Sequence, residues 1–367
     1  MKRSQNQIVT ALLMPFSLLY GIGVFLRNLF FDTGIFSSHE FSFPVISVGN
    51  ITVGGTGKTP HVEHIVSILK GSFSIAVLSR GYKRRSSGFV IASTASRVKD
   101  VGDEPLQIKR KFPEVEVAVD GDRVNGIRKL INYNSKLNAV ILDDAFQHRW
   151  VKPGISILLV DYNQPFTEDS LLPAGRLREP VSSKKRAAIV IYSKCPPDMQ
   201  PIERRIIRKE LNLFPWQSLY FTTYAYGNPR PVFRETEPFP EREKFRNMKS
   251  PVLMITGIAY PVLFEKYLNE FSPRVKKIVF PDHHNYTIRD MQHIGKEWES
   301  IENNQKIIIT TEKDAIRFQN FNTIDIEIKK KMYYIPVRIN FIENDGEEFR
   351  KQILHYVGDN KRDHIIS

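Results

Sequence analysis

The stretch GNITVGGTGKTP, from Gly49 to Pro60, ends like a phosphate-binding loop but does not begin like one. The usual pattern is a glycine, four further residues, and then Gly-Lys-Ser or Gly-Lys-Thr. Thr52 stands where the first glycine belongs. An apolar strand pattern, FPVISVG, precedes the loop, and a helical pattern, TPHVEHIVSILK, follows it. This strand-loop-helix order predicts a P-loop that binds a nucleotide.

The residue types of the loop suit phosphate binding. Glycine tolerates a positive φ, so successive backbone N–H groups can converge on phosphate oxygens at the start of a helix. Lys58 is expected to reach the β- and γ-phosphates, and Thr59 to ligate Mg²⁺. The predicted nucleotide-binding residues are Thr52, Val53, Gly54, Gly55, Thr56, Gly57, Lys58 and Thr59.

Other P-loop classes fit less well. One class of membrane-associated ATPases carries an extra lysine just before the paired glycines, where this chain has Val53. A regulatory GTPase needs Asn-Lys-x-Asp, whereas Lys313 is followed directly by Asp314, and DDAF does not supply Asp-x-x-Gly. A membrane-bound positioning or transport ATPase, which would hydrolyse ATP without a lipid acceptor, stays an alternative.

The second motif is ILDDAFQHR, residues 141–149. The preceding apolar run predicts a buried strand, so Asp143 and Asp144 emerge at its carboxyl end, where open α/β sheets place their ligands. Two adjacent carboxylates repel each other unless a cation neutralises them, and Mg²⁺ is the cation we expect. The alternative is a turn with a helix-capping aspartate. His148 is a weaker candidate than the two aspartates, because a single histidine after a strand is as often structural as catalytic.

Composition indicates an anionic partner and a reducing compartment. Lys+Arg 53 against Asp+Glu 40 gives a net charge of +13, spread over short clusters. Such a charge suits a phosphorylated lipid, a membrane surface or a nucleic acid. No stacking module, zinc site or recognition helix supports nucleic acid, which is the weaker alternative. Cys195 is the only cysteine, so an intrachain disulfide and a cysteine-based metal cluster are excluded.

The first thirty residues predict a membrane-associating segment. No charged side chain occurs from Ser4 to Leu26, a length that could cross a bilayer. Lys2 and Arg3 would hold the N-terminus in the cytoplasm, so a true span would place the nucleotide site outside, away from ATP. We therefore expect a helix or helical hairpin lying in the cytoplasmic face of the membrane. A true span and a helix buried in the protein core are the alternatives.

Strand and helix patterns alternate along the rest of the chain, which predicts an α/β fold with a mostly parallel sheet flanked by helices. A second, smaller α/β domain begins after a proline-rich stretch at residues 227–240. We predict a membrane-associating helix at 1–30, a P-loop domain at 31–230, and a second domain at 231–367 that closes over the active-site cleft. The apolar runs read as strands are FPVISVG, SIAVLSR, VEVAVD, LNAVILDD, ISILLVD and AAIVIYS, then PVLMITG, VKKIVFPD, QKIIITTE and YYIPVRI.

Together the motifs resemble the tetraacyldisaccharide 4'-kinases of lipid A biosynthesis. The matching motifs are GNITVGGTGKTP, LSRGY (78–82), VGDEP (101–105), DDAFQHR (143–149), LPAGRLRE (172–179), ITGIAYP (255–261), FPDHH (280–284) and TTEKDA (310–315). In this family, threonine in place of the first loop glycine is normal. The resemblance implies transfer of the γ-phosphate of ATP to the 4'-hydroxyl of a lipid A disaccharide 1-phosphate, with Mg²⁺. It implies the cytoplasmic face of the inner membrane, with an anionic surface as partner and no obligate protein partner.

The resemblance also assigns roles to residues outside the loop. Asp103 and His283, the latter in preference to His284, match a catalytic dyad that removes the proton from the sugar hydroxyl. From local sequence alone, Asp103 is an ordinary helix start before Pro105. Arginine binds phosphate through a planar fork, which suits the lipid 1-phosphate. The predicted substrate-binding residues are Asn50, Arg80, Tyr82, Glu104, Arg123, His148 and Arg178.

Overall fold

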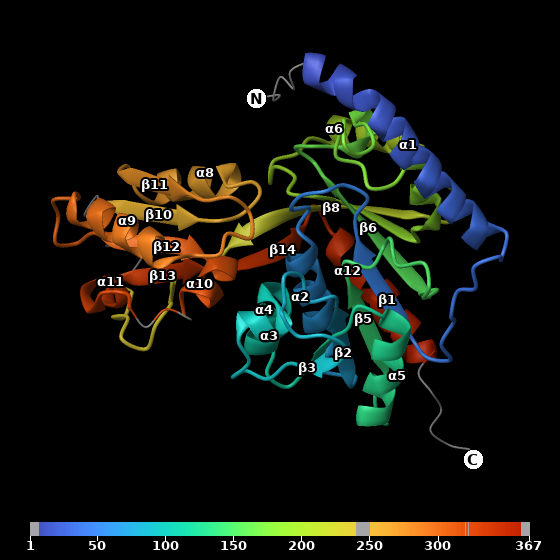
Figure 1. Ribbon diagram of the computed structural model, residues 1–367, viewed down its shortest axis with the longest axis horizontal. Helices are drawn as coiled ribbons and strands as arrows, with labels where there is room; N and C mark the ends of the chain where they lie inside the picture. Colours follow the sequence, from blue (N-terminus) through green and yellow to red (C-terminus); the bar gives the residue numbers. More distant parts are fainter. Residues whose placement is uncertain (1–6, 240–249, 320, 322, 361–367) are drawn as a thin grey trace.

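Two sheets make up the protein. The computed structural model describes residues 7–239, 250–319, 321 and 323–360. Figure 1 shows a larger lobe around a nine-stranded sheet and a smaller lobe around a five-stranded sheet. The order of the larger sheet is β14-β8-β7-β6-β1-β5-β2-β4-β3. Neighbouring strands from β8 to β4 run parallel, and an antiparallel strand closes each edge.

The six apolar runs predicted as strands before residue 227 all belong to the larger sheet, which also contains three strands that were not predicted there. Its strands are β1 (Val45–Gly49), β2 (Ile75–Ser79), β3 (Val90–Ile91), β4 (Glu116–Val119), β5 (Ala139–Asp143), β6 (Ile155–Asp161), β7 (Ile189–Ser193), β8 (Ser218–Tyr226) and β14 (Val337–Phe341). β1, β2, β5 and β7 are buried at every position, because helices or loops cover both faces.

Helices cover both faces of this sheet. They are α2 (Lys58–Leu69), α3 (Val98–Val101), α4 (Asp103–Lys111), α5 (Arg123–Tyr133), α6 (Pro201–Leu211) and α12 (Asp345–Asp359), with 3-10 turns η1 (Phe166–Glu168) and η2 (Val181–Arg186). α2, α4 and α12 share one apolar cluster with inward residues of β1 and β6. α5 and α6 pack in separate clusters against the alternate residues, so they cover the opposite face.

The smaller lobe repeats the same architecture. Its strands are β9 (Arg230–Pro231), β10 (Val252–Thr256), β11 (Val275–Val279), β12 (Ile307–Thr311) and β13 (Met332–Ile335), in the order β11-β10-β12-β13-β9. Its helices are α8 (Val262–Phe271), α9 (Ile288–Glu299), α10 (Glu312–Phe318) and α11 (Ile326–Lys330). Two apolar clusters, one on each face, form its core. The fold is therefore α/β in both lobes, as predicted.

Three features differ from the sequence prediction. YYIPVRI is not one strand, because Pro336 separates β13 in the smaller sheet from β14 in the larger sheet. Proline has no N–H to continue a ladder, so the chain changes sheets there. β8 was not predicted, and it ends directly before the proline-rich stretch at residues 227–240. Because the chain changes sheets at Pro336, residues 337–359 pack with the larger lobe. The second domain predicted from the sequence instead runs from 231 to 367. The boundaries near residues 30 and 230 stay predictions.

The N-terminal segment is a single helix, α1 (Gln7–Asp32), and not a hairpin. It is long and apolar enough to cross a membrane, the one such helix within the described residues. Among its described side chains, from residue 9 onward, Ser17 and Phe31 alone are buried, which contradicts the alternative of a core helix. Ser17 Oγ donates to Leu171 O at 3.0 Å, and Tyr20 Oη donates to Arg178 O at 2.9 Å. Both contacts hold the middle of α1 against the larger lobe.

Candidate active site

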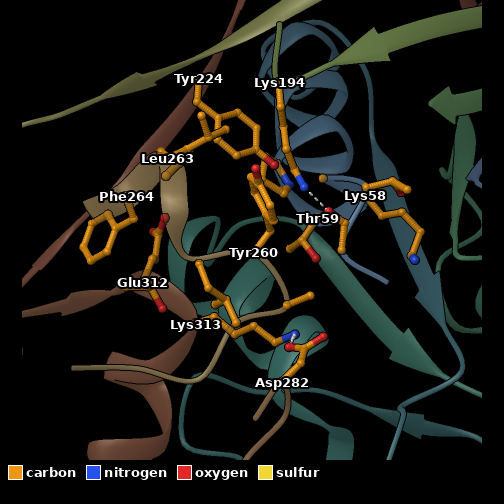
Figure 2. A pocket seen from close by; sticks show the side chains of 18 of the residues that line it. Lys58, Thr59, Lys194, Tyr224, Tyr260, Leu263, Phe264, Asp282, Glu312 and Lys313 are labelled. Carbon is orange, nitrogen blue, oxygen red and sulfur yellow. Dashed lines mark hydrogen bonds and ion pairs between the residues drawn. The ribbon is translucent and has the colours of Figure 1, made fainter. Parts of the chain in front are cut away.

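A cleft between the two lobes contains the P-loop. Residues 54–60 line one wall, and Asp282, His283 and Lys313 of the smaller lobe line the other. In Figure 2, Lys58 and Thr59 lie at one end of this pocket and Leu263 and Phe264 at the other, with Tyr260 between them. Residues from both predicted domains thus face a single cavity.

The P-loop has the predicted backbone. Gly54 and Gly57 have φ values of 113° and 84°, in the range that favours glycine. A side chain at Gly57 would also lie 2.6 Å from the hydroxyl of Tyr224. Thr52 bridges to Leu177, so this unusual first position ties the loop to the segment around residue 177. Lys58 begins α2 directly after Gly57, at the helix N-terminus that binds phosphate in such loops.

Asp143 and Asp144 lie at the carboxyl end of β5, as predicted, and their environments differ. Burial raises the pKa of Asp143 to about 7, and the negative charges of Glu104 and Asp144 add to the shift. For Asp144, burial is outweighed by the positive charges of Lys58 and Arg178, which hold its pKa at about 2. Lys58 Nζ lies 3.6 Å from Asp144 Oδ1. The pair can therefore bind both a proton and a cation.

Arg178 joins the loop preceding α2 to the aspartate pair. Its Nη2 donates to Asp144 Oδ1 at 3.0 Å and to the carbonyl and side-chain oxygens of Asn50. Asn50 is fully buried, and its Oδ1 also lies 3.4 Å from Lys58 Nζ. The structure thus brings Asn50, Lys58, Asp144 and Arg178 together.

Asp103 and His283 meet across the cleft. Asp103 begins α4 in the larger lobe, and His283 follows β11 in the smaller one, with their Oδ2 and Nδ1 atoms 3.1 Å apart. Arg317 of α10 also donates to Asp103 Oδ2. Burial alone would raise the pKa of Asp103, but the His283 hydrogen bond and the charges of Lys313 and Arg317 hold it well below its usual range. His283 lines the cavity, whereas Asp103 is buried behind it.

Lys313 is a cleft residue that sequence reasoning missed. Its Nζ lies 2.9 Å from His283 Nε2, and 3.4 Å from both Glu104 Oε1 and Asp282 Oδ1. Because His283 Nδ1 faces Asp103, the Nε2 lone pair is free to accept from the Lys313 ammonium group. In the sequence, TTEKDA lacks the GTPase signature and is one of the motifs of the family resemblance. Lys313 follows the end of a strand there, which is the one local signal for its position.

The other predicted substrate residues are more scattered. Tyr82 is exposed, and its ring contacts the His283 ring edge-on at 4.9 Å between centroids. Arg80 is exposed and directly follows β2. Arg123 is buried, and its guanidinium donates to the backbone oxygens of Asp120 and Asp143. His148 Nε2 is buried without a hydrogen-bond partner, and its ring lines a separate cavity.

Lys194 is a second missed residue. It follows β7 with a φ of 61°, donates to Gly55 O in the P-loop, and pairs with Asp161 Oδ2 at 2.6 Å. Asp144 and His283 also have a positive φ, of 48° and 55°. A left-handed backbone is unfavourable for residues with a Cβ and is concentrated at functional sites. For Lys194, the sequence offers one signal, which is a lysine directly after an apolar strand.

The oxygen donors near the P-loop fit Mg²⁺. Thr59 and the two aspartates supply a hydroxyl and carboxylates, the ligands that Mg²⁺ prefers. Asp143 Oδ1 is buried and has no hydrogen-bond partner, which a bound cation would supply. Within the part of the chain that the structure describes, no three His, Cys, Asp or Glu side chains alone could hold a metal ion. Phosphate and water oxygens would therefore complete the shell.

Comparison with known proteins gives one consistent match. A family model described as "Tetraacyldisaccharide-1-P 4'-kinase" matches residues 9–358. A protein of Phocaeicola vulgatus named "Tetraacyldisaccharide 4'-kinase" is 46% identical over 357 residues, covering 97% of each chain. A protein of that name from Bacteroides fragilis is 45% identical, covering 95% of this chain and 94% of that protein. A crystal structure of "apo" form LpxK from Aquifex aeolicus in complex with ATP superposes with a TM-score of 0.73 at 28% identity, covering 95% of this chain and 99% of that one.

Proposed function

Because this chain belongs to the tetraacyldisaccharide-1-P 4'-kinase family, we propose how its residues carry out the family's reaction. The chain is an ATP-dependent kinase of lipid A biosynthesis. It transfers the γ-phosphate of ATP to the 4'-hydroxyl of tetraacyldisaccharide 1-phosphate and forms lipid IVA. The P–O bond between the γ-phosphorus and ADP breaks, a P–O bond to the sugar oxygen forms, and the hydroxyl proton must go to a base.

ATP binds with its phosphates on residues 52–59 and its base at the aromatic end of the cleft. The glycine-rich loop supplies N–H donors at the start of α2, and Lys58 supplies the positive charge. Leu263 and Phe264 line the opposite end, with Tyr260 between the two ends, so a flat base would find apolar surface there (Figure 2). Lys194, which contacts the loop, lies between the two ends.

Thr59, Asp143 and Asp144 hold Mg²⁺ in this proposal. The ion, when bound, neutralises phosphate charge as the γ-phosphoryl group is transferred. Lys58 and Arg178 already balance the charge of Asp144. The support for this assignment is the donor set itself together with the unpartnered Oδ1 of Asp143.

The Asp103–His283 pair accepts the proton of the sugar hydroxyl. His283 Nε2 faces the cavity, and Asp103 holds the ring through Nδ1, which fixes the tautomer with a free lone pair at Nε2. Lys313 occupies that lone pair in this structure. We infer that Lys313 turns to the γ-phosphate when ATP enters, because a phosphate is a stronger attraction for an ammonium group than a neutral imidazole.

In this proposal the lipid acceptor contacts Asn50 and Arg178 beside the P-loop and the exposed side chains of Arg80 and Tyr82. Arg178 bridges Asp144 to the loop, and Tyr20 of α1 donates to the carbonyl of Arg178. α1 thus leads directly to the phosphoryl-transfer site. Glu104 lines the cleft beside Lys313, whereas Arg123 acts from behind it, since Arg123 holds backbone oxygens next to Asp143. His148 lines a separate cavity, and its part in substrate binding rests on the family resemblance.

α1 lies in the cytoplasmic face of the inner membrane and does not cross it. Its outward side chains, such as Leu12, Phe16, Leu19 and Phe25, are exposed and apolar. Ser17 and Tyr20, in the middle of the helix, bond to the larger lobe. A spanning helix would have to break these contacts, because its middle would be surrounded by lipid.

One experiment tests this function directly. The purified chain is incubated with ATP labelled at the γ-position and tetraacyldisaccharide 1-phosphate in detergent, with and without Mg²⁺. A labelled lipid that carries two phosphates is the expected product. Release of labelled inorganic phosphate at the same rate with and without the lipid would instead identify an ATPase that has no lipid acceptor.

A further inference from the structure

α6 and the loop that follows it expose apolar side chains that the catalytic cleft does not use. Ile202 and Ile206 of α6 are 57% and 50% exposed. After the helix, Phe214 and Trp216 are 41% and 65% exposed, and their rings stack at 4.5 Å with an interplanar angle of 12°. A helix facing only water would carry polar residues at these positions.

Basic residues share this outward face. Arg205 and Lys209 are exposed and lie three residues after Ile202 and Ile206 respectively, so they point to the same side of the helix. Neither forms an ion pair with a carboxylate among the described residues. The inward side of α6, with Ile207 and Leu211, packs in the core of the larger lobe. We call Ile202, Arg205, Ile206, Lys209, Phe214 and Trp216 the α6 surface.

The α6 surface adjoins α1 through one short segment. Asp32, the last residue of α1, pairs with Lys185 of η2 at 3.2 Å. The neighbouring Lys184 donates to Leu211 O at the end of α6, and Gln217, next to Trp216, donates to Lys184 O at 2.9 Å. Figure 1 shows α1 and α6 on the same side of the nine-stranded sheet.

The geometry points to a second membrane contact: the α6 surface docks on an anionic lipid bilayer beside α1. Exposed apolar residues, unpaired basic residues and an exposed tryptophan are the composition of a helix that lies in a membrane interface. Attachment at α1 and at the α6 surface would restrict rotation of the protein about α1. The Arg178 side of the cleft would then stay directed at the lipid substrate. This inference rests on the proposed membrane position of α1.

Fluorescence of Trp216 tests the contact in the full chain. A Trp150→Phe background leaves Trp216 and the buried Trp298 as reporters. Vesicles of phosphatidylglycerol and phosphatidylethanolamine, with and without brominated acyl chains, are the probe. Protein that co-sediments with the vesicles should show quenching by the brominated lipid, and the quenching should disappear after a further Trp216→Phe change. Bound protein whose Trp216 is not quenched would overturn the inference.

Matched serine variants test the effect on activity. Ile202→Ser with Ile206→Ser should lower turnover of substrate in vesicles about tenfold or more and leave turnover in detergent unchanged. Arg205→Gln with Lys209→Gln should weaken vesicle binding at low salt about fivefold for each charge. Ile288→Ser is the control, because Ile288 is 61% exposed on the smaller lobe. Equal turnover of all variants in vesicles would contradict the inference.

The same measurements separate other failures. Transfer in detergent without vesicle binding would refute the membrane position of α1 and this contact, but not the kinase reaction. Absence of transfer in detergent would refute the proposed function while Trp216 quenching could still be measured. A dimer in lipid-free buffer that the isoleucine variants abolish would identify a second copy of the chain as the occupant, and would overturn the lipid assignment.

Discussion

Replacing Asp103 and His283 by alanine, singly and together, tests the proposed proton transfer. Loss of an acid–base group should lower kcat ~10²-fold or more, which at 1.36 kcal/mol per factor of ten is about 2.7 kcal/mol of transition-state stabilisation. Because the pair accepts one proton as a unit, the double variant should be hardly slower than the more damaging single variant. ATP affinity should change little, since neither side chain contacts the P-loop among the described contacts.

The two single variants should differ in stability. Asp103 is 5% exposed and accepts from Arg317, His283 and the backbone N–H of Glu104. Its loss leaves buried donors unsatisfied and should lower the free energy of unfolding by about 1–3 kcal/mol. His283→Ala should cost less, because Arg317 still holds Asp103 and also pairs with Asp314 at 3.0 Å.

Single-turnover transfer of labelled phosphate separates chemistry from binding, and urea unfolding measures stability. His284→Ala is the matched control: His284 Nε2 contacts Asp290 at 2.9 Å within the smaller lobe and does not reach Asp103. Its kcat should stay within a few-fold of the parent. Additive losses in the double variant, or a main effect on ATP binding, would refute the dyad and move the base role to Asp143 or Asp144.

Five other predictions rest on the same geometry. Lys58→Ala should cost on the order of 3 kcal/mol in transition-state stabilisation with folding intact, and unchanged turnover would exclude the P-loop as the catalytic site. Lys313→Met should raise the KM for ATP, whereas Lys313→Arg should restore part of the affinity; equal KM values in all three proteins would exclude a phosphate contact. Protons and Mg²⁺ compete for Asp143, whose pKa is raised to about 7. Titration calorimetry should therefore show weaker Mg²⁺–ADP binding as pH falls through about 7. This pH dependence of the affinity should vanish in Asp143→Asn. The raised pKa also means that the protein without Mg²⁺ should lose stability as pH rises from about 4 to about 7, because the folded state binds the proton more tightly. Deleting residues 1–26 should abolish vesicle binding and lower activity in bilayers more than in detergent, and equal losses would indicate that α1 serves folding.

Local patterns predicted the elements that depend on local physics. The P-loop was recognisable because a buried strand, three glycines and a helix start lie within one short stretch. Asp143 and Asp144 were placed correctly because the carboxyl ends of parallel strands meet at one edge. The strand β8, SLYFTTYAY, was not predicted, because it leads directly into a proline-rich stretch that is typical of a linker. Nothing in YYIPVRI itself shows that its two halves join different sheets.

Contacts between the lobes could not be predicted from the residues alone. Asp103 and His283 are 180 positions apart, and their pairing was expected only through the family resemblance. Lys313 and Arg317 lie on α10, one helical turn apart, and both reach the same carboxylate region of the larger lobe. Their role depends on how the two lobes meet, which no periodicity within either lobe determines.

The distribution of charge links ATP binding to the proton transfer. Lys58 contacts Asn50 and Asp144, and Lys313 contacts His283 and Glu104. Each lysine is therefore bound to a group with another role in the reaction, since Asp144 is a proposed Mg²⁺ ligand and His283 the proposed base. A triphosphate between them would attract both lysines at once. The departure of Lys58 frees Asp144 for Mg²⁺, and the departure of Lys313 frees Nε2 of His283 for the hydroxyl proton. The dyad would therefore become basic at its cavity face only when ATP is present, which limits proton transfer to the complete ternary complex.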